Sequence, residues 1–181
     1  MADGQRFCSA CGSEAAGAAP VDQAERRHAT VMFSDLSGYT ALNEALDPEE
    51  VEAVMARIKA DATTIVERLG GTVNQFVGDE IMALFGVPLA HRHDPRSAVT
   101  AALELHRAVD AFVLTLAHGP ARSLRMHTGI NAGLVVVRRS DLRAGDYTLT
   151  GDAVNTAARL RGLAAPGEIV VSESTWQQVA D

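Results

Sequence analysis

A tight β-hairpin signal in the middle of the chain restricts the fold more than any other feature. Two short β-prone runs, 72–77 and 80–85, are separated only by Gly78-Asp79. A two-residue loop that begins with glycine is typical of such a hairpin, because its first residue needs a positive φ. The sequence therefore predicts an antiparallel strand pair with Asp79 at its tip.

Long helical segments flank this hairpin on both sides. The first begins at Asp47-Pro48, which combines a capping residue with a proline at the first helical position, and ends at Gly70-Gly71. Its apolar residues recur at the helical period and form one stripe: Val51, Val54, Met55, Ile58, Ala62, Ile65, Val66 and Leu69. The second begins at Asp94-Pro95 and is predicted to end at Gly119-Pro120.

The remaining segments complete an α+β order. We expect a buried strand over 28–35, a strand pair over 125–137 broken near Ala132-Gly133, a helix over 151–163, a strand over 168–171 and a helix over 172–180. Helices would pack on one antiparallel-rich sheet, an arrangement that resembles the ferredoxin-like or palm-like βαββαβ plan.

Composition limits the classes of partner. The chain has 181 residues, 47% of them apolar, which suits one domain with a core; we expect a flexible leader over 1–27 and the domain over 28–181. A net charge of -7 argues against nucleic acid as a partner. The longest apolar run, around Ile81 to Ala90, is about half of the ~20 residues that a membrane span needs. With no secretory leader pattern, the sequence favours a cytoplasmic protein.

Two aspartates are candidates for metal binding. Asp35 ends the first predicted strand and Asp79 lies at the hairpin tip, so pairing of these strands would bring two carboxylates together. Adjacent carboxylates repel each other unless a cation lies between them. The turn at 36–40 supplies backbone N–H groups that could hold phosphate oxygens, which suggests a two-metal nucleotide site. The alternative is that both aspartates are ordinary turn residues.

A second candidate pair is Asn155 and Arg159, which lie four residues apart on one helical face. An amide beside a guanidinium suits the negative charge that develops on a transferring phosphoryl group. The alternative is a solvated polar face. His127, within a predicted strand, is expected to be structural, and the 91–94 segment to be a solvated loop.

The cysteines Cys8 and Cys11 form half of a zinc-ribbon knuckle. Tetrahedral zinc needs four ligands, so this chain would bind zinc only by sharing a four-thiolate site with a second chain. The alternative, which we favour, is a knuckle without metal.

Three segments together resemble the ordered blocks of class III nucleotidyl cyclase catalytic domains. They read VMFSDLSGYT at 31–40, FVGDEIMALFG at 76–86 and GDAVNTAARL at 151–160. The resemblance covers about Arg27 to the C-terminus. Each block alone would be a weak signal, whereas all three in order are specific.

The resemblance implies a head-to-tail homodimer with two shared active sites. One protomer would bind two Mg²⁺ or Mn²⁺ ions through Asp35, Asp79 and the backbone carbonyl of Leu36. The turn formed by Ser37, Gly38, Tyr39 and Thr40 would lie against the triphosphate. The other protomer would supply Asn155 to orient the ribose and Arg159 to stabilise the transition state, and ATP would become 3′,5′-cyclic AMP and pyrophosphate.

The resemblance also identifies two base-selecting positions, Gln75 and Thr148. Thr148 fits the bacterial subclass that uses threonine, whereas Gln75 stands where a lysine is usual. A glutamine amide can face the edge of adenine or, flipped, that of guanine, but the guanylyl pair of Glu and Cys is absent, so adenine is favoured. Family domains usually continue beyond the 172–180 helix with strands that carry a lysine, so we expect the chain to be part of a longer protein. The alternatives are a guanylyl cyclase and a catalytically silent cyclase-like module.

Overall fold

A twisted sheet organises the chain in the structure, a computed structural model that describes residues 24–115, 124–139 and 147–180. Within these residues the sheet has six strands, in the order β2-β3-β1-β4-β5, with β6 parallel to β4 and every other pair antiparallel. The strands are β1 (Glu25–Ser37), β2 (Gly71–Val77), β3 (Glu80–Phe85), β4 (Arg125–Arg139), β5 (Tyr147–Thr150) and β6 (Ile169–Val171).

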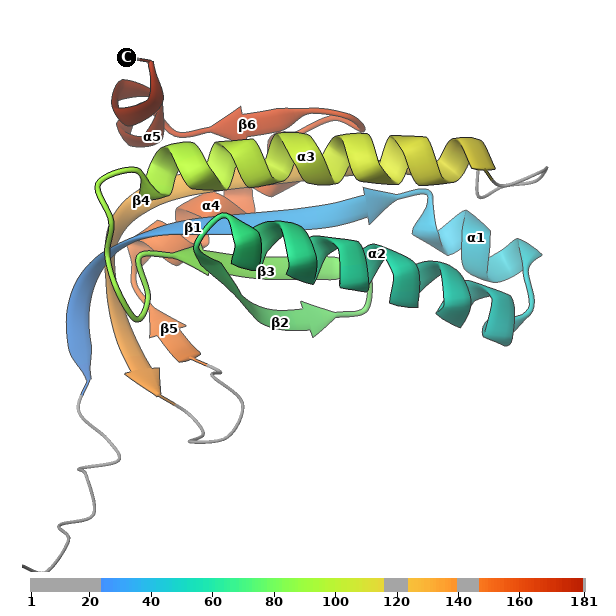
Figure 1. Ribbon diagram of the computed structural model, residues 1–181, viewed down its shortest axis with the longest axis horizontal. Helices are drawn as coiled ribbons and strands as arrows, with labels where there is room; N and C mark the ends of the chain where they lie inside the picture. Colours follow the sequence, from blue (N-terminus) through green and yellow to red (C-terminus); the bar gives the residue numbers. More distant parts are fainter. Residues whose placement is uncertain (1–23, 116–123, 140–146, 181) are drawn as a thin grey trace, which may run out of the picture.

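Helices cover both faces of this sheet (Figure 1). The long helices α2 and α3 lie on one face and α4 on the other, while α5 packs beside β4 and α3. Their bounds are α1 (Tyr39–Ala45), α2 (Pro48–Arg68), α3 (Asp94–Thr115), α4 (Asp152–Leu163) and α5 (Glu173–Val179). The predicted α+β class is confirmed, and β1, α2, the β2–β3 hairpin, α3 and β4 follow the βαββαβ plan.

The local signals in the sequence act as expected at most element ends. Asp47 and Glu50 form a reciprocal capping box at the start of α2, with Pro48 in the first turn. Gly78 has φ of +62° in the β2–β3 turn, which is why a glycine is needed there. The predicted end of the second long helix near Gly119 lies outside the described residues.

Two expectations about strands were wrong. The segment predicted as a strand pair broken near Ala132-Gly133 is the single strand β4, which pairs with β1 from Glu25↔Val137 to Ser37↔Arg125. Gly133 allows α4 to approach closely rather than making a turn, since a Cβ there would lie 3.0 Å from the Cβ of Ala153. The first strand also continues past Asp35 to Ser37, because β4 supplies pairing partners as far as that residue.

The alternation of side chains between the two faces of β1 decides which face of the sheet Asp35 lies on. Val31 and Phe33 pack in the apolar cluster under α4, whereas Leu36 packs in the cluster under α2 and α3. Successive strand side chains point to opposite faces, so Asp35 shares the α4 face with Val31 and Phe33. The sheet thereby presents this carboxylate to the helix that carries the third sequence block.

Candidate functional site

The structure brings Asp35 and Asp79 together, as the sequence predicted. Asp35 lies near the end of β1, and Asp79 lies in the turn between β2 and β3. Because β1 pairs directly with β3, the strand end and the hairpin tip meet at one edge of the sheet. The two carboxyl groups are within hydrogen-bonding contact.

Asp79 is a weaker acid here than a free aspartate. Burial, then the hydrogen bond to Asp35 and the charge of Asp35, raise the pKa of Asp79 from 3.8 to about 6. Backbone N–H groups of Asp79 and Leu36 oppose this rise in part. Two carboxylates held this closely share a proton or require a cation, so the pair has the chemistry of a divalent-metal site.

The turn after Asp35 leads directly from β1 into α1. Ser37 is the last residue of β1, and Gly38 follows with φ of +90° as the residue that precedes α1. Tyr39 and Thr40 form the first turn of that helix. The side chain of Leu36 is 3% exposed and anchors the turn in the core, while its backbone N–H donates to Asp35 Oδ1 at 3.0 Å.

Three charged or titratable side chains that the sequence analysis did not assign to the site surround Asp35. Arg161 donates from Nη1 to Asp35 Oδ2 at 2.9 Å and from Nη2 to Glu80 Oε2 at 2.5 Å. His127 Nε2 lies 3.7 Å from the same oxygen of Asp35, and its Nδ1 donates to the backbone carbonyl of Arg161 at 3.1 Å. Arg161 is therefore the counter-ion of this acidic site within the protomer.

A helical stripe in the sequence could have identified Arg161. Ala153 and Ala157 are the buried, inward residues of α4, and Arg161 continues their four-residue spacing. An arginine on an otherwise apolar stripe indicates a buried acidic partner. Among the described residues, the Nε of Arg161 is a buried side-chain nitrogen without a hydrogen-bond partner.

A buried polar chain holds the strand just before Asp35. Ser34 and Thr128 are fully buried, and their hydroxyl oxygens are 2.8 Å apart across β1 and β4. His106 Nε2 lies 2.8 Å from the Thr128 hydroxyl. Burial lowers the pKa of His106, with the Gly167 carbonyl opposing the shift, so the chain is built from neutral groups. These bonds fix the position of the strand that carries Asp35.

Asn155 and Arg159 do not join this cluster. Both are exposed on α4, on the side away from the sheet, whereas Arg161 turns inward. Side chains placed this way can reach a ligand held by another molecule, which is the arrangement expected of a shared site.

The two predicted base-selecting residues lie at one cavity. Gln75 on β2 and Thr148 on β5 line a space of about 420 Å³. Phe33, Met82 and Val154, from the apolar cluster under α4, also line it. An apolar wall with a few polar groups at the rim is the usual form of a small-molecule site.

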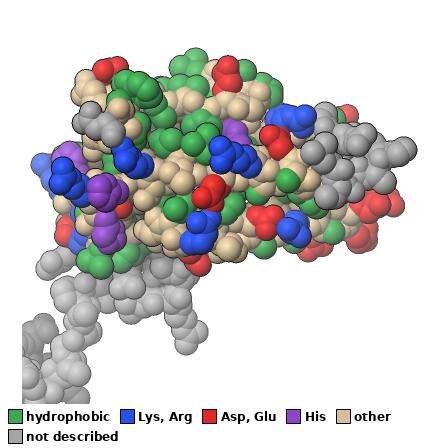
Figure 2. Space-filling view, turned by 45° about the horizontal axis from the view of Figure 1, so that its top comes forward, with side chains coloured by type: hydrophobic (Ala, Val, Ile, Leu, Met, Phe, Trp, Pro, Cys, Tyr) green, Lys and Arg blue, Asp and Glu red, His purple; other side chains and the backbone are tan. Residues whose placement is uncertain are grey.

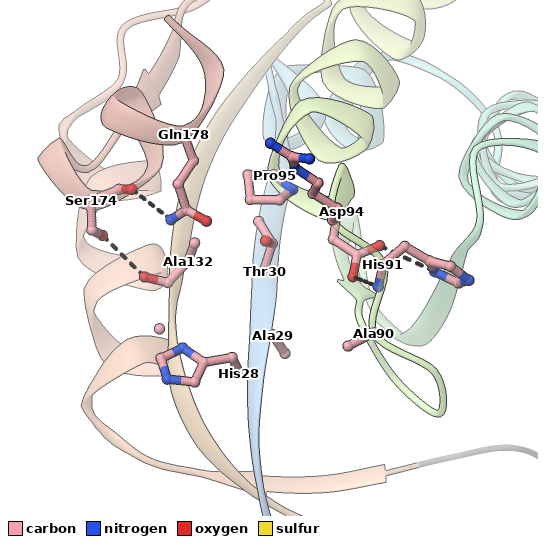
Figure 3. Close-up of a pocket in the computed structure, with 12 residues that line it drawn as sticks. His28, Ala29, Thr30, Ala90, His91, Asp94, Pro95, Ala132, Ser174 and Gln178 are labelled. Atoms are coloured by element: carbon pink, nitrogen blue, oxygen red, sulfur yellow. Dashed lines mark hydrogen bonds and ion pairs between the residues drawn. The ribbon is translucent and has the colours of Figure 1, made fainter. Parts of the chain in front are cut away.

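A second cavity of about 320 Å³ lies near the opposite end of β1, beside His28 and Thr30 (Figure 3). Asp94 and His91 face each other at its rim, where the backbone N–H of His91 donates to Asp94 Oδ2 at 2.6 Å. Asp94, the first residue of α3, is thus buried in the segment that was expected to be a solvated loop, whereas His91 is exposed.

The surface agrees with the charge balance of the sequence. Acidic and basic side chains are interspersed on the face in Figure 2, with no broad basic area among its described residues. In the part of the chain that the structure describes, no helix combines the length and apolar character of a membrane span. Cys8 and Cys11 lie outside the described residues, so the zinc hypothesis stays a prediction.

Comparison with solved structures supports the fold. The adenylyl cyclase CyaB from P. aeruginosa superposes with a TM-score of 0.78 at 29% identity, over 88% of this chain and 83% of that one. The guanylyl cyclase Cya2 superposes with a TM-score of 0.77 at 33% identity, over 87% and 81% of the two chains.

The sequence relatives include both adenylate cyclases and guanylate cyclases. Adenylate cyclase 1 of Rhizobium meliloti is 31% identical over 139 residues, which are 76% of this chain and 21% of the relative. An adenylate cyclase of Anabaena cylindrica is 32% identical, over 79% of this chain and 28% of the relative. A receptor-type guanylate cyclase of Caenorhabditis elegans is 31% identical, over 86% and 13%. This chain therefore spans less than a third of the length of these relatives.

The family described as "Adenylate and Guanylate cyclase catalytic domain" matches residues 21–180, which includes all three sequence blocks and every described element. With the fold, the carboxylate pair and the relatives in agreement, the chain belongs to the class III adenylate and guanylate cyclase family.

Proposed function

We propose that this domain is an adenylyl cyclase that converts ATP to 3′,5′-cyclic AMP and pyrophosphate at sites shared by two protomers. The observation that carries the proposal is the contact between Asp35 and Asp79, where burial together with the neighbouring carboxylate raises the pKa of Asp79 to about 6. A domain that used this fold only for association would have no need of such a repulsive pair.

The donor set fits divalent cations that prefer oxygen ligands. Asp35 and Asp79 would hold two Mg²⁺ or Mn²⁺ ions together with the carbonyl of Leu36. Cations bound there would lower the pKa of a coordinated hydroxyl and neutralise charge on the phosphates. Arg161 donates to Oδ2 of Asp35, so that oxygen is paired with a guanidinium of the same chain.

The outward position of Asn155 and Arg159 supports a homodimer with head-to-tail pairing. In that arrangement Asn155 of one protomer orients the ribose of the nucleotide bound to Asp35 and Asp79 of its partner. Arg159 faces the α-phosphate as charge grows there. The 3′-hydroxyl gives its proton to water and its oxygen bonds to the α-phosphorus, while the bond from that phosphorus to the bridging oxygen breaks and pyrophosphate leaves.

Adenine is the proposed base because Gln75 and Thr148 offer hydroxyl and amide groups and no carboxylate. The N1 and amino edge of adenine requires one donor and one acceptor, which a glutamine amide provides. A guanylyl cyclase is the second candidate, since the Gln75 amide can flip and a guanylyl cyclase matches this fold at 33% identity.

The direct test is the formation of cyclic nucleotides from ATP and, separately, from GTP, with Mn²⁺ and at high protein concentration. We expect cyclic AMP that disappears in Asp79→Ala, with Glu44→Ala, an exposed carboxylate on α1, as the control that keeps activity. Cyclic GMP as the sole product would show that the preferred base is guanine and not adenine. No product from either nucleotide, if it persisted in a longer chain that includes the strands expected beyond α5, would favour the third candidate, a silent cyclase-like module.

Complementation tests the shared site. A mixture of Asp35→Ala and Arg159→Ala chains should regain part of the activity that each has lost, because one of the two sites in a heterodimer is intact. Two inactive variants that form dimers yet fail to restore each other would contradict the head-to-tail arrangement.

A further inference from the structure

We propose that Asn74 is a positioning residue for base selection, which sets the distance between Gln75 and Thr148 by joining the two outer strands of the sheet. This inference rests on the proposed function, because it assigns the cavity at these residues to the nucleotide base. Asn74 also lines this cavity, but both polar atoms of its amide are engaged by Tyr147, so it acts through its neighbours.

The side chain of Asn74 makes two opposite hydrogen bonds to one backbone position. Its Nδ2 donates to the carbonyl of Tyr147 at 3.0 Å, and its Oδ1 accepts from the N–H of Tyr147 at 2.8 Å. A residue in an antiparallel ladder exchanges the same pair of bonds with the residue opposite it. The amide of Asn74 therefore replaces a backbone pairing between β2 and β5.

These strands have no ladder of their own. In the order β2-β3-β1-β4-β5 they are the two ends of the path, with three strands between them. Among the hydrogen bonds of the described residues, the Asn74 amide is what links them, and the residue is only 7% exposed. Buried, doubly paired amides of this kind are costly to disrupt, because each lost partner leaves a polar group unsatisfied.

The backbone of β2 is adapted to this contact. Its register with β3 shifts between Val73 and Gln75, so that Asn74 is the extra residue of a bulge. A bulge redirects a side chain relative to its neighbours, and here the inserted residue is the one that reaches β5. The next residue, Gln75, is exposed at the cavity.

The Asn74 amide also sets the distance between the two base-selecting residues. Gln75 follows Asn74 directly and Thr148 follows Tyr147 directly, so the two hydrogen bonds join the positions that precede the base-selecting residues. The width of the cavity between Gln75 and Thr148 is then fixed by the amide. Without it the two strands are free to separate, and hydrogen bonds that require both side chains lose their alignment.

Two substitutions separate this role from general stability. Asn74→Leu removes both bonds at similar size, and Asn74→Asp keeps the acceptor for the Tyr147 N–H but puts an oxygen against the Tyr147 carbonyl. The matched control is Val109→Ala, which opens the core on the other face of the sheet, at a residue 1% exposed on α3. The measured quantities are kcat and KM for ATP and for GTP.

We expect Asn74→Leu to lower the ratio of kcat/KM for ATP to that for GTP by about tenfold, the size of one base-directed hydrogen bond. The change should be in KM for ATP more than in kcat, because base contacts bind the substrate and the transition state alike. The ATP-to-GTP ratio of Asn74→Asp should lie between the ratios of the wild type and of Asn74→Leu, and Val109→Ala should leave the ratio unchanged. An unchanged ratio in both Asn74 variants, or an equal change in the control, would overturn the proposal.

Two further measurements do not depend on turnover. Hydrogen exchange at the Tyr147 amide should be slow in the wild type and in Asn74→Asp, and at least tenfold faster in Asn74→Leu. Binding of α,β-methylene ATP and its GTP counterpart, in which a carbon bridge blocks loss of pyrophosphate, should show the same drop in discrimination. If the wild type made no cyclic nucleotide, the proposed function would fail, but the ratio of the two binding constants would still decide the role of Asn74. If neither analogue bound, the proposed role of Asn74 would be overturned.

Discussion

Gly129 on β4 lies directly against the backbone of α4, and it leaves no space for a side chain. A Cβ at this position would lie 2.1 Å from the backbone nitrogen of Arg161 and 2.4 Å from the carbonyl oxygen of Ala157. Both obstacles are helix backbone, so a rotamer change cannot relieve them, and α4 would have to retreat by roughly 1 Å. Overpacking typically costs about 1–3 kcal/mol. We expect Gly129→Ala to lower the free energy of unfolding by about 3 kcal/mol, the upper end of that range, because the obstruction is rigid.

Denaturation in urea at one fixed protein concentration measures this loss, with Gly162→Ala as the control. Gly162 also lies on α4, but a Cβ there meets nothing within 4 Å, so its replacement should stabilise the helix by about 0.5–1 kcal/mol. The same retreat of α4 should weaken the bond from Arg161 to Asp35. A loss below about 1 kcal/mol in Gly129→Ala would refute the claim that this packing fixes α4.

Two further predictions concern the acidic site. Arg161→Gln should tighten Mn²⁺ binding about tenfold, as measured by calorimetric titration, because the substitution removes the cation that neutralises Asp35 and Glu80. Weaker Mn²⁺ binding would contradict this and would mean that Arg161 orients Asp35 for the metal. Because the folded chain raises the pKa of Asp79 from 3.8 to about 6, it holds an extra proton between these values, and metal-free protein should lose stability as the pH rises through 6. Thermal denaturation in EDTA should show this loss, Asp79→Asn should flatten it, and added Mn²⁺ should reverse it.

The elements that were predicted correctly are those with strong local signals. The capping sequence at Asp47-Pro48 and the Gly78-Asp79 turn act within a few residues, so α2 and the β2–β3 hairpin follow from the sequence. The meeting of Asp35 and Asp79 needs only one further assumption, that the first strand pairs beside the hairpin, and this is confirmed.

The features that were missed depend on contacts between distant segments. Gly133 resembles a strand breaker in the sequence, yet it serves the packing of Ala153 from a helix some twenty residues later. β5 has four residues and, among the described strands, pairs with the end of β4, so it is too short to give a periodic signal of its own. The link from Asn74 to Tyr147 spans 73 residues, and no local pattern predicts it.

The helix α4 shows why residue type alone could not separate the roles of its arginines. Arg159 and Arg161 are two positions apart, and residues at that spacing lie on different helical faces. Arg161 continues the inward stripe of Ala153 and Ala157 and reaches Asp35 of its own protomer, whereas Arg159 shares the outward face with Asn155. One short helix thus places a counter-ion at the acidic site of its own chain and, in the proposed dimer, would present an amide and a guanidinium to a second one. If the proposed dimer forms, α4 couples the two sites, because a shift that loosens Arg161 from one site also moves Arg159 in the other.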